Sequence, residues 1–391
     1  MNTQHNNNID SSDYSEYKKQ IINCPDIYKV DQDGVLEVFA YKKCANDSDD
    51  LIKKCRSTIF HNNKIISKGF VFTPEYTPED YPEINSKIQF GGNTKISFFK
   101  SYEGFLIRIF YFQDKWYVTT NKRLNAFKSF WASRESFGSI FVNALKAGVG
   151  FEAELTDRIN ESENIMDNFL DCIHKNYQYT FIVSNNKDNR IVCDSPDSCA
   201  LYHLETLDVD TGKLIDSDYI GVPQPELLKF NSYNEIYSYV HCIDITKYQG
   251  LLVQTQSGQF KILNSFYKKL FDLRGNEASL SFRYIQLRKS SSYSDIDMFI
   301  KMYPAILPKI RMIENKILHV CSFMHDLYTS RYIKKINKAT LVPEQYNFLK
   351  KCHNLYITTR EYISKNVILT NLNSLLPSSL NRLLKTIPFE C

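Results

Sequence analysis

The sequence predicts an α+β fold in which a mixed, β-rich domain is followed by an α-helical domain. Two patterns support this prediction. Runs rich in β-branched and aromatic residues, typical of strands, recur up to about residue 285. From Ser294 to the end, apolar residues recur every three or four positions, which is the period of an amphipathic helix. We therefore expect a disordered polar tail over residues 1–16, a first domain over 17–285 and a helical domain over 286–391.

The predicted strands are short runs dominated by Val, Ile, Thr, Tyr and Phe. The polar residues 113–115 (Q-D-K) separate the run at 105–112 from a second run that begins at Trp116. This spacing is typical of a β-hairpin. The strand-like runs lie at residues 65–72, 105–112, 179–193, 201–207 and 250–263.

Helices are predicted where apolar residues follow a spacing of three and four. Within the first domain this spacing occurs at residues 136–147 and 161–175. In the second domain it forms stripes over residues 299–324 and 343–365. Such stripes are typical of the core of a helical bundle, and we interpret them as core rather than as a binding surface.

The composition is that of a soluble globular protein, and it disfavours several kinds of site. The net charge of +4 and the pI of about 8.3 permit a nucleic-acid partner without requiring one. The 10 cysteines contain no C-x-x-C pair and the 8 histidines no H-E-x-x-H motif, so we expect no metal site of these types. No G-x-S-x-G motif or P-loop occurs. No apolar run approaches the length of a membrane span, and we expect a cytosol-like, reducing compartment.

Four short motifs follow one another along the chain. They begin at Arg56 (R-S-T-I-F), Ser101 (S-Y-E-G-F-L), Asp188 (D-N-R-I-V) and Gln249 (Q-G-L-L-V-Q, continuing to F-K-I-L). In their order and spacing over residues 55–267, the chain resembles the ATP-dependent RNA ligases of the bacteriophage tRNA-repair type and their relatives in large DNA viruses. The resemblance implies a nucleotidyltransferase domain of the ATP-grasp-like ligase class, followed by a helical C-terminal domain.

The resemblance also implies a three-step reaction that uses ATP and Mg²⁺. A lysine attacks the α-phosphate of ATP and forms a lysyl-adenylate; the AMP then moves to an RNA 5′-phosphate, and an RNA 3′-hydroxyl displaces it. Such a site needs a reactive lysine, cations for the phosphates, and carboxylates for the metal and the ribose. On the matching motifs, the resemblance assigns nucleotide binding to Arg56, Ser101, Glu103, Gly104, Gln249 and Lys261.

The nucleophile motif departs from the family pattern K-x-(D/E)-G. Counting back three residues from Gly104 leads to Ser101, and Lys100 comes one residue early. Adjacent side chains of an extended strand point to opposite faces. Lys100 is therefore the candidate catalytic residue only if a bulge turns its side chain toward the nucleotide. Otherwise it is a lysine of the opposite strand face.

The other motifs depart at positions of chemistry as well. The usual R-G is Arg56-Ser57, and the strand before Asn189 lacks the family's glutamate. The usual E-G is Gln249-Gly250, whose neutral amide does not supply the charge that Mg²⁺ prefers. In the usual K-x-K, Lys261 matches and Leu263 replaces the second lysine. The flanking apolar residues persist, so the departures predict a ligase scaffold that has lost its reaction.

Basic residues outside these motifs suggest a nucleic-acid contact. Lys122, Arg123 and Lys128 alternate with Phe127, Phe130 and Trp131, a mixture that suits single-stranded RNA. The alternative is a polar face over a buried aromatic core. Residues 331–335 and 350–351 form two further basic runs, which we interpret as solvated helix faces.

Three functions stay open. The first is a catalytically degenerate, RNA-ligase-like protein that still binds RNA or a nucleotide. The second is an active ATP-dependent RNA ligase that forms a lysyl-adenylate. The third is a structural or assembly subunit of a viral particle or complex. If the chain is viral, we expect it in the host cytoplasm or in the virion.

Overall fold

The structure is a computed structural model that describes residues 11–88, 90, 96–215, 219–256, 258–336 and 340–389. The chain divides into two compact units, Met1–Lys269 and Leu270–Cys391. The division therefore lies before the boundary at residue 285 that the sequence predicts. The reason is helix α9 (Leu280–Ser290), which contacts α10, α11 and α14 of the second unit but lacks a clear apolar stripe. Residues 11–16 of the predicted disordered tail lie in helix α1 (Ser11–Asn23), which corrects that part of the prediction.

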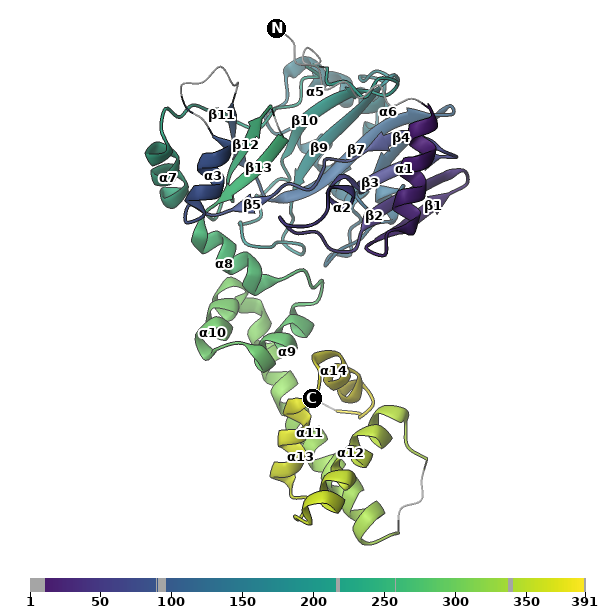
Figure 1. Cartoon of the computed structure of the whole chain (residues 1–391), viewed down its shortest axis with the longest axis vertical. Helices are drawn as coiled ribbons and strands as arrows, with labels where there is room; N and C mark the ends of the chain where they lie inside the picture. Colours follow the sequence, from purple (N-terminus) through teal and green to yellow (C-terminus); the bar gives the residue numbers. More distant parts are fainter. Residues whose placement is uncertain are drawn as a thin grey trace. The chain divides into compact units, whose positions relative to one another are not determined.

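The strands form three sheets (Figure 1), in which neighbouring strands are joined by backbone hydrogen bonds. Sheet 1 is antiparallel and contains β1 (Ile27–Asp33), β2 (Leu36–Tyr41), β3 (Arg56–His61) and β4 (Lys64–Lys68). Sheet 2 is antiparallel and contains β10 (Leu201–Asp208), β9 (Tyr177–Ser184), β7 (Gly104–Phe112) and β8 (Lys115–Thr119). Sheet 3 contains β11 (Leu227–Leu228), β6 (Ser97–Ser101), β12 (Gly250–Thr255), β13 (Gly258–Leu263) and β5 (Glu75–Tyr76), the last parallel to β13.

Helices cover one face of sheet 2 and one face of sheet 3. Helices α4 (Phe137–Ala147), α5 (Ala153–Ile159) and α6 (Ile165–Leu170) pack on sheet 2 around buried residues such as Phe141 and Phe181. Helices α3 (Tyr81–Lys87) and α7 (Tyr233–Cys242) pack on sheet 3 (Figure 1). Phe98, Leu251 and Ile262 of sheet 3 are buried beneath these two helices, and the alternate residues of the same strands lie on the opposite face.

Several predicted elements agree with the structure. The hairpin is formed by β7 and β8, and its turn residues Gln113 and Asp114 both have positive φ, as a type I′ turn requires. The predicted helix at 136–147 is α4, which begins at the N-cap Ser136 and ends at Gly148 in the left-handed region.

Other predicted elements are too long. The predicted strand at 250–263 is the hairpin β12–β13, because the chain reverses before Gly258, whose φ of +134° suits glycine. The predicted strand at 179–193 ends at Ser184, and the predicted helix at 161–175 is reduced to α6. The predicted strand at 65–72 ends at Lys68, since β4 pairs with β3 no further.

The second unit is helical. Helix α11 (Leu307–Tyr328) is its longest element and buries Ile310, Ile313, Ile317 and Met324 along one stripe. The α+β class and the helical C-terminal region are thus confirmed. The described chain contains no helix that is both long and apolar enough to cross a membrane. The remaining helical elements are α2 (Asp50–Lys54), η1 (Ala126–Lys128), α8 (Ser265–Arg274), α10 (Tyr293–Met302), η2 (Pro304–Ile306), η3 (Thr329–Ile333), α12 (Pro343–Thr359), α13 (Lys365–Ser374) and α14 (Pro377–Lys385).

Candidate functional site

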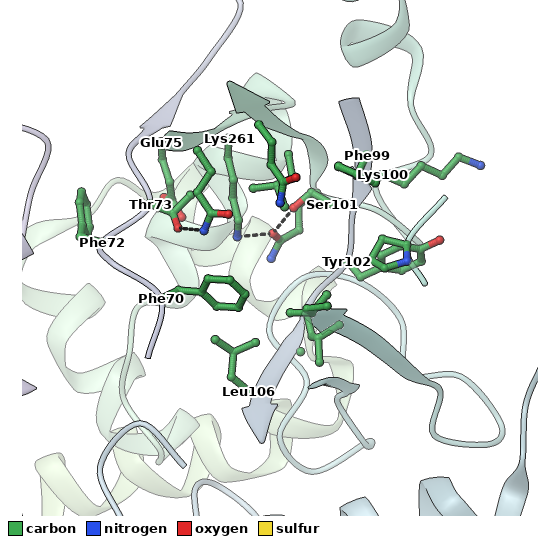
Figure 2. Close-up of a pocket in the computed structure, with 18 of the residues that line it drawn as sticks. Phe70, Phe72, Thr73, Glu75, Phe99, Lys100, Ser101, Tyr102, Leu106 and Lys261 are labelled. Atoms are coloured by element: carbon green, nitrogen blue, oxygen red, sulfur yellow. Dashed lines mark hydrogen bonds between the residues drawn. The ribbon is translucent and has the colours of Figure 1, made fainter. Parts of the chain in front are cut away.

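A pocket of about 280 Å³ opens in the first unit and is lined by residues of all three sheets. Its lining includes Arg56, Glu75 and Lys261, and also Lys100, whose side chain extends away from Ser101 and Lys261 (Figure 2). The structure brings together most residues that the resemblance assigns to nucleotide binding. Those that line the pocket are Arg56, Ser101, Gly104, Gln249 and Lys261; Figure 2 labels Ser101 and Lys261 among them.

Strand β6 places Ser101 and Lys100 on opposite faces of sheet 3. Phe98 lies in the core beneath α3 and α7, and Lys100 shares its face by strand alternation. β6 pairs with β12 in an unbroken register, in which the buried Leu251 is opposite Lys100. No bulge interrupts this pairing, so nothing turns Lys100 toward the face that carries Ser101.

The ammonium group of Lys100 is held outside the site. Its Nζ lies 2.6 Å from Oε2 of Glu226 and 4.8 Å from the ring centre of Tyr248. Figure 2 shows the side chain extending away from Ser101 and Lys261. The hydrogen bond to Glu226 raises the pKa of Lys100, which keeps the amine protonated. A nucleophilic amine needs the opposite shift.

Ser101 lies inside the pocket and joins a polar chain with Gln249 and Lys261. The Ser101 hydroxyl donates to Oε1 of Gln249 over 3.0 Å, and Nζ of Lys261 donates to the same oxygen over 2.8 Å. Because an ammonium can only donate, the atom of Gln249 that faces Lys261 is its oxygen. Burial lowers the pKa of Lys261, and the nearby Arg56 acts in the same direction while Glu75 opposes it.

The same chain of hydrogen bonds continues from Gln249 through Tyr267 to Glu103. Nε2 of Gln249 donates to the Tyr267 hydroxyl over 2.8 Å, and that hydroxyl donates to Oε2 of Glu103 over 3.0 Å. The amide nitrogen of Gln249 is thus needed as a donor. A glutamate at position 249 would place an acceptor against the Tyr267 hydroxyl, whose single proton is already donated to Glu103.

Glu103 anchors a loop and does not line the pocket. Its carboxylate accepts hydrogen bonds from the backbone N–H groups of Ile191, Val192 and Cys193 at 2.9, 2.8 and 3.1 Å. Nδ2 of Asn185 donates to it as well, at 3.3 Å. Glu103 is only 6% exposed, and these donors rather than a ligand occupy its carboxylate oxygens. Its contribution to the site is to hold the 189–193 loop and Tyr267.

The close approach of two strands in sheet 2 requires a glycine at position 104. A Cβ built on it would lie 2.2 Å from the backbone oxygen of Val183, because β7 approaches β9 closely there. The glycine that the motif requires is therefore explained by the pairing of sheet 2.

The residues present do not fit the metal site that the resemblance implies. Oε1 of Gln249 already accepts two hydrogen bonds, one from an ammonium that would repel a cation. Glu75 is the single carboxylate among the residues that line the pocket. The described chain also contains no group of three or more His, Cys, Asp or Glu side chains placed to hold a metal ion.

Ser57 replaces the usual glycine after Arg56 and keeps the glycine-like backbone, with φ of +65°. The hydroxyl of Ser57 accepts a hydrogen bond from Nη2 of Arg108 at 2.7 Å, and its carbonyl accepts one from Nη1 at 3.0 Å. Arg108 is buried in β7, and burial lowers its pKa to about 10. These bonds to a buried guanidinium compensate for the strained backbone of Ser57.

Glu205 of β10 lies near Arg108 and gives a pH-dependent prediction. Burial raises its pKa from 4.5 to about 7, although Thr180 and Arg108 act against the shift. The folded state therefore holds a proton that the unfolded state releases, and the unfolding free energy falls as pH rises from 4.5 to about 7. In Glu205→Gln, we expect the loss of stability between about pH 5 and pH 8 to shrink by roughly 2 kcal/mol. Urea unfolding at both pH values measures this loss of stability. The control is Glu154→Gln, which changes an exposed glutamate. If the wild-type protein and both variants showed the same pH dependence, Glu205 would not be the residue whose pKa is raised.

The predicted nucleic-acid residues Lys122, Arg123 and Lys128 do not line the pocket. Nη1 of Arg123 lies 3.3 Å from Oδ1 of Asp31, whose other oxygen accepts from the backbone N–H of Leu124. Lys122 and Lys128 are exposed. Their role in binding RNA stays a prediction.

Sequence reasoning missed Tyr267, Arg108, Glu205 and Phe70, the last of which lines the pocket (Figure 2). A charged residue within an apolar strand, as in F-L-I-R-I-F and L-E-T-L, is a signal for a buried polar network. Tyr267 and Phe70 carry no such signal, because their contacts arise only in the folded chain.

Among solved structures, the chain is similar to two forms of an archaeal ATP-dependent RNA ligase. The TM-scores are 0.41 and 0.40, at 10% and 11% identity, over 75% and 74% of this chain and 72% and 70% of those chains. It is also similar to a Naegleria gruberi RNA ligase mutant with ATP and Mn, at a TM-score of 0.33 and 13% identity, over 51% of this chain and 57% of that chain.

In sequence, the chain is similar to viral proteins. It is 26% identical over 354 residues to the immediate-early protein ICP-46 homolog of Invertebrate iridescent virus 3, which covers 87% of this chain and 74% of that protein. The homolog of the same name in Invertebrate iridescent virus 6 is 26% identical over 360 residues, or 84% and 76% of the two chains. No family model matches the chain.

Proposed function

We propose that this protein binds a nucleotide non-covalently in the pocket of a ligase-like nucleotidyltransferase scaffold and does not form a lysyl-adenylate. One observation carries the proposal. The position of the motif's nucleophile is occupied by Ser101, hydrogen-bonded to Gln249, while the neighbouring Lys100 is paired with Glu226 on the other face of the sheet.

Ser101 is not equipped to replace a nucleophilic lysine. A serine hydroxyl attacks a phosphate only when a base removes its proton. The Ser101 hydroxyl donates to a neutral amide oxygen, which is not basic enough to remove its proton. The third member of the chain, Lys261, donates to the same oxygen and so offers no lone pair toward Ser101. These hydrogen bonds fix the positions of Ser101, Gln249 and Lys261, and they provide no base for a proton transfer.

The pocket retains what is needed to hold a nucleotide. Arg56 and Lys261 line it with one carboxylate, Glu75, so its inward-facing cations outnumber its carboxylates. Two such cations suit the phosphates of ATP. Aromatic residues including Tyr41 and Phe70 line the same pocket and offer apolar surface for a base. RNA remains the proposed macromolecular partner, with ATP as the nucleotide that the ligase resemblance favours.

The covalent step is tested by incubating the protein with α-labelled ATP and Mg²⁺ or Mn²⁺, followed by denaturing electrophoresis. We expect no labelled band from the wild-type protein or from Lys100→Ala. A wild-type band that disappears in Lys100→Ala would overturn the proposal and make Lys100 the nucleophile. Label that appears only in Ser101→Lys would support it, because the pocket would then orient ATP correctly and lack only the amine.

A further inference from the structure

The two units differ strongly in charge. Residues 270–391 contain 18 Lys and Arg against 9 Asp and Glu, whereas residues 1–269 contain 30 against 35. The basic surplus of the whole chain therefore comes entirely from the helical unit. Such an asymmetry points to an anionic partner for that unit.

Within the helical unit, four rings from α11, η3 and α12 pack against one another. Tyr328 and Tyr332 have ring centres 5.2 Å apart with planes at 29°. Tyr332 and His353 lie 4.1 Å apart at 22°, and His353 and Tyr356 lie 6.0 Å apart at 22°. Tyr328 is buried, whereas Tyr332, His353 and Tyr356 are partly exposed. We call these four residues the aromatic ladder.

The ladder exists because helix α11 changes its geometry at its end. Residues Thr329–Ile333 continue it as the π-helical turn η3, in which the Lys334 N–H donates to the Thr329 carbonyl at 2.9 Å. This wider turn carries Tyr332 to the ring of His353 on α12. Short π-helical turns are rare and occur frequently at functional sites.

Unpaired lysines border the ladder. Lys334 and Lys335 follow η3, and both are exposed. On α12, Tyr346, Lys350, His353 and Ile357 are spaced by four, three and four residues, so they follow one another along one helix face. Among the described residues, no carboxylate forms an ion pair with Lys334, Lys335 or Lys350. The sequence predicted these two basic runs to be solvated helix faces. In the structure each run flanks a ring of the aromatic ladder: Lys334 and Lys335 follow Tyr332, and Lys350 precedes His353 on α12.

We propose that the aromatic ladder and its bordering lysines bind single-stranded nucleic acid. An unpaired base would extend the stack on the exposed ring faces, and the lysines would contact the adjacent phosphates. A duplex keeps its base faces covered and could use only the lysines. This site is separate in sequence and chemistry from the nucleotide pocket of the first unit.

The test uses the full chain and a fluorescein-labelled single-stranded RNA, measured by fluorescence anisotropy at about 50 mM salt. We expect Lys334→Glu with Lys350→Glu to weaken binding by roughly tenfold or more. The matched control, Lys309→Glu with Arg311→Glu, reverses two exposed charges about 25 Å along α11 from the ladder and should change affinity less than about threefold. Equal losses in both variants would overturn the proposal, since binding would then follow net charge alone.

The stacking component has its own pair of variants. Tyr332→Phe keeps the ring and should bind within about twofold of wild type, whereas Tyr332→Leu should lose roughly fivefold or more. Equal affinity of Tyr332→Leu and wild type would overturn the stacking role, as would equal binding of duplex and single-stranded RNA. Ladder-dependent binding to phosphatidylserine vesicles without RNA binding would assign the surface to membranes instead. Lys261→Met should leave RNA affinity unchanged, which separates this site from the pocket.

Discussion

Replacing Glu103 by alanine is expected to destabilise the first unit by roughly 3–5 kcal/mol, the largest effect among the variants considered. The carboxylate is buried and accepts from three consecutive backbone N–H groups, from Asn185 and from Tyr267. Alanine would leave these donors unpaired in a site that water does not readily reach. Thermal unfolding followed by circular dichroism should show a midpoint lowered by roughly 10 °C.

The matched control for this variant is Glu154→Ala, an exposed glutamate of α5. Its midpoint should lie within about 2 °C of wild type, because surface changes rarely exceed about 0.5 kcal/mol. Glu103→Gln keeps the shape and one oxygen acceptor, so we expect an intermediate loss. If Glu103→Ala unfolded like Glu154→Ala, the carboxylate would not be the anchor of the 189–193 loop.

Replacing Lys261 by methionine is expected to weaken ATP binding by roughly 30-fold or more, the second large effect. Lys261 supplies one of the two cations that face the pocket, and methionine keeps the length of its stem without the charge. Isothermal titration calorimetry measures the affinity. Burial lowers the pKa of Lys261, so wild-type affinity should also decline as pH rises through that lowered pKa, sooner than for an ordinary lysine.

Lys100→Met is the control, since it removes the same charge one residue from Ser101 but from the opposite face of β6. We expect its ATP affinity to stay within about threefold of wild type. A loss in Lys100→Met as large as in Lys261→Met would mean that Lys100 turns into the pocket when the nucleotide binds.

The orientation of Lys100 could be predicted because it depends only on local geometry. Strand alternation separates Lys100 from Ser101, and the unbroken β6–β12 register preserves that alternation. The ordered motifs likewise predicted which residues would meet, and Arg56, Ser101 and Lys261 do line one pocket. Arg56 lies on β3, Ser101 on β6 and Lys261 on β13, so a strand carries each of these three residues to the pocket.

The role of Glu103 could not be predicted in this way. The motif places it beside the nucleotide, yet its partners are backbone groups of a loop nearly ninety positions further along the chain. Hydrogen bonds to backbone N–H groups leave no residue-type signal in a sequence. The division between the units was missed for a related reason, since α9 is buried through Tyr284, Ile285 and Leu287 rather than along a regular stripe.

The central claim is that the pocket binds a nucleotide without capturing it covalently. Equilibrium dialysis of the wild-type protein against α-labelled ATP, with half of the sample denatured before counting, tests both parts at once. We expect saturable label on the native protein and none after denaturation. Label that survives denaturation, or no label on the native protein at millimolar ATP, would contradict the claim.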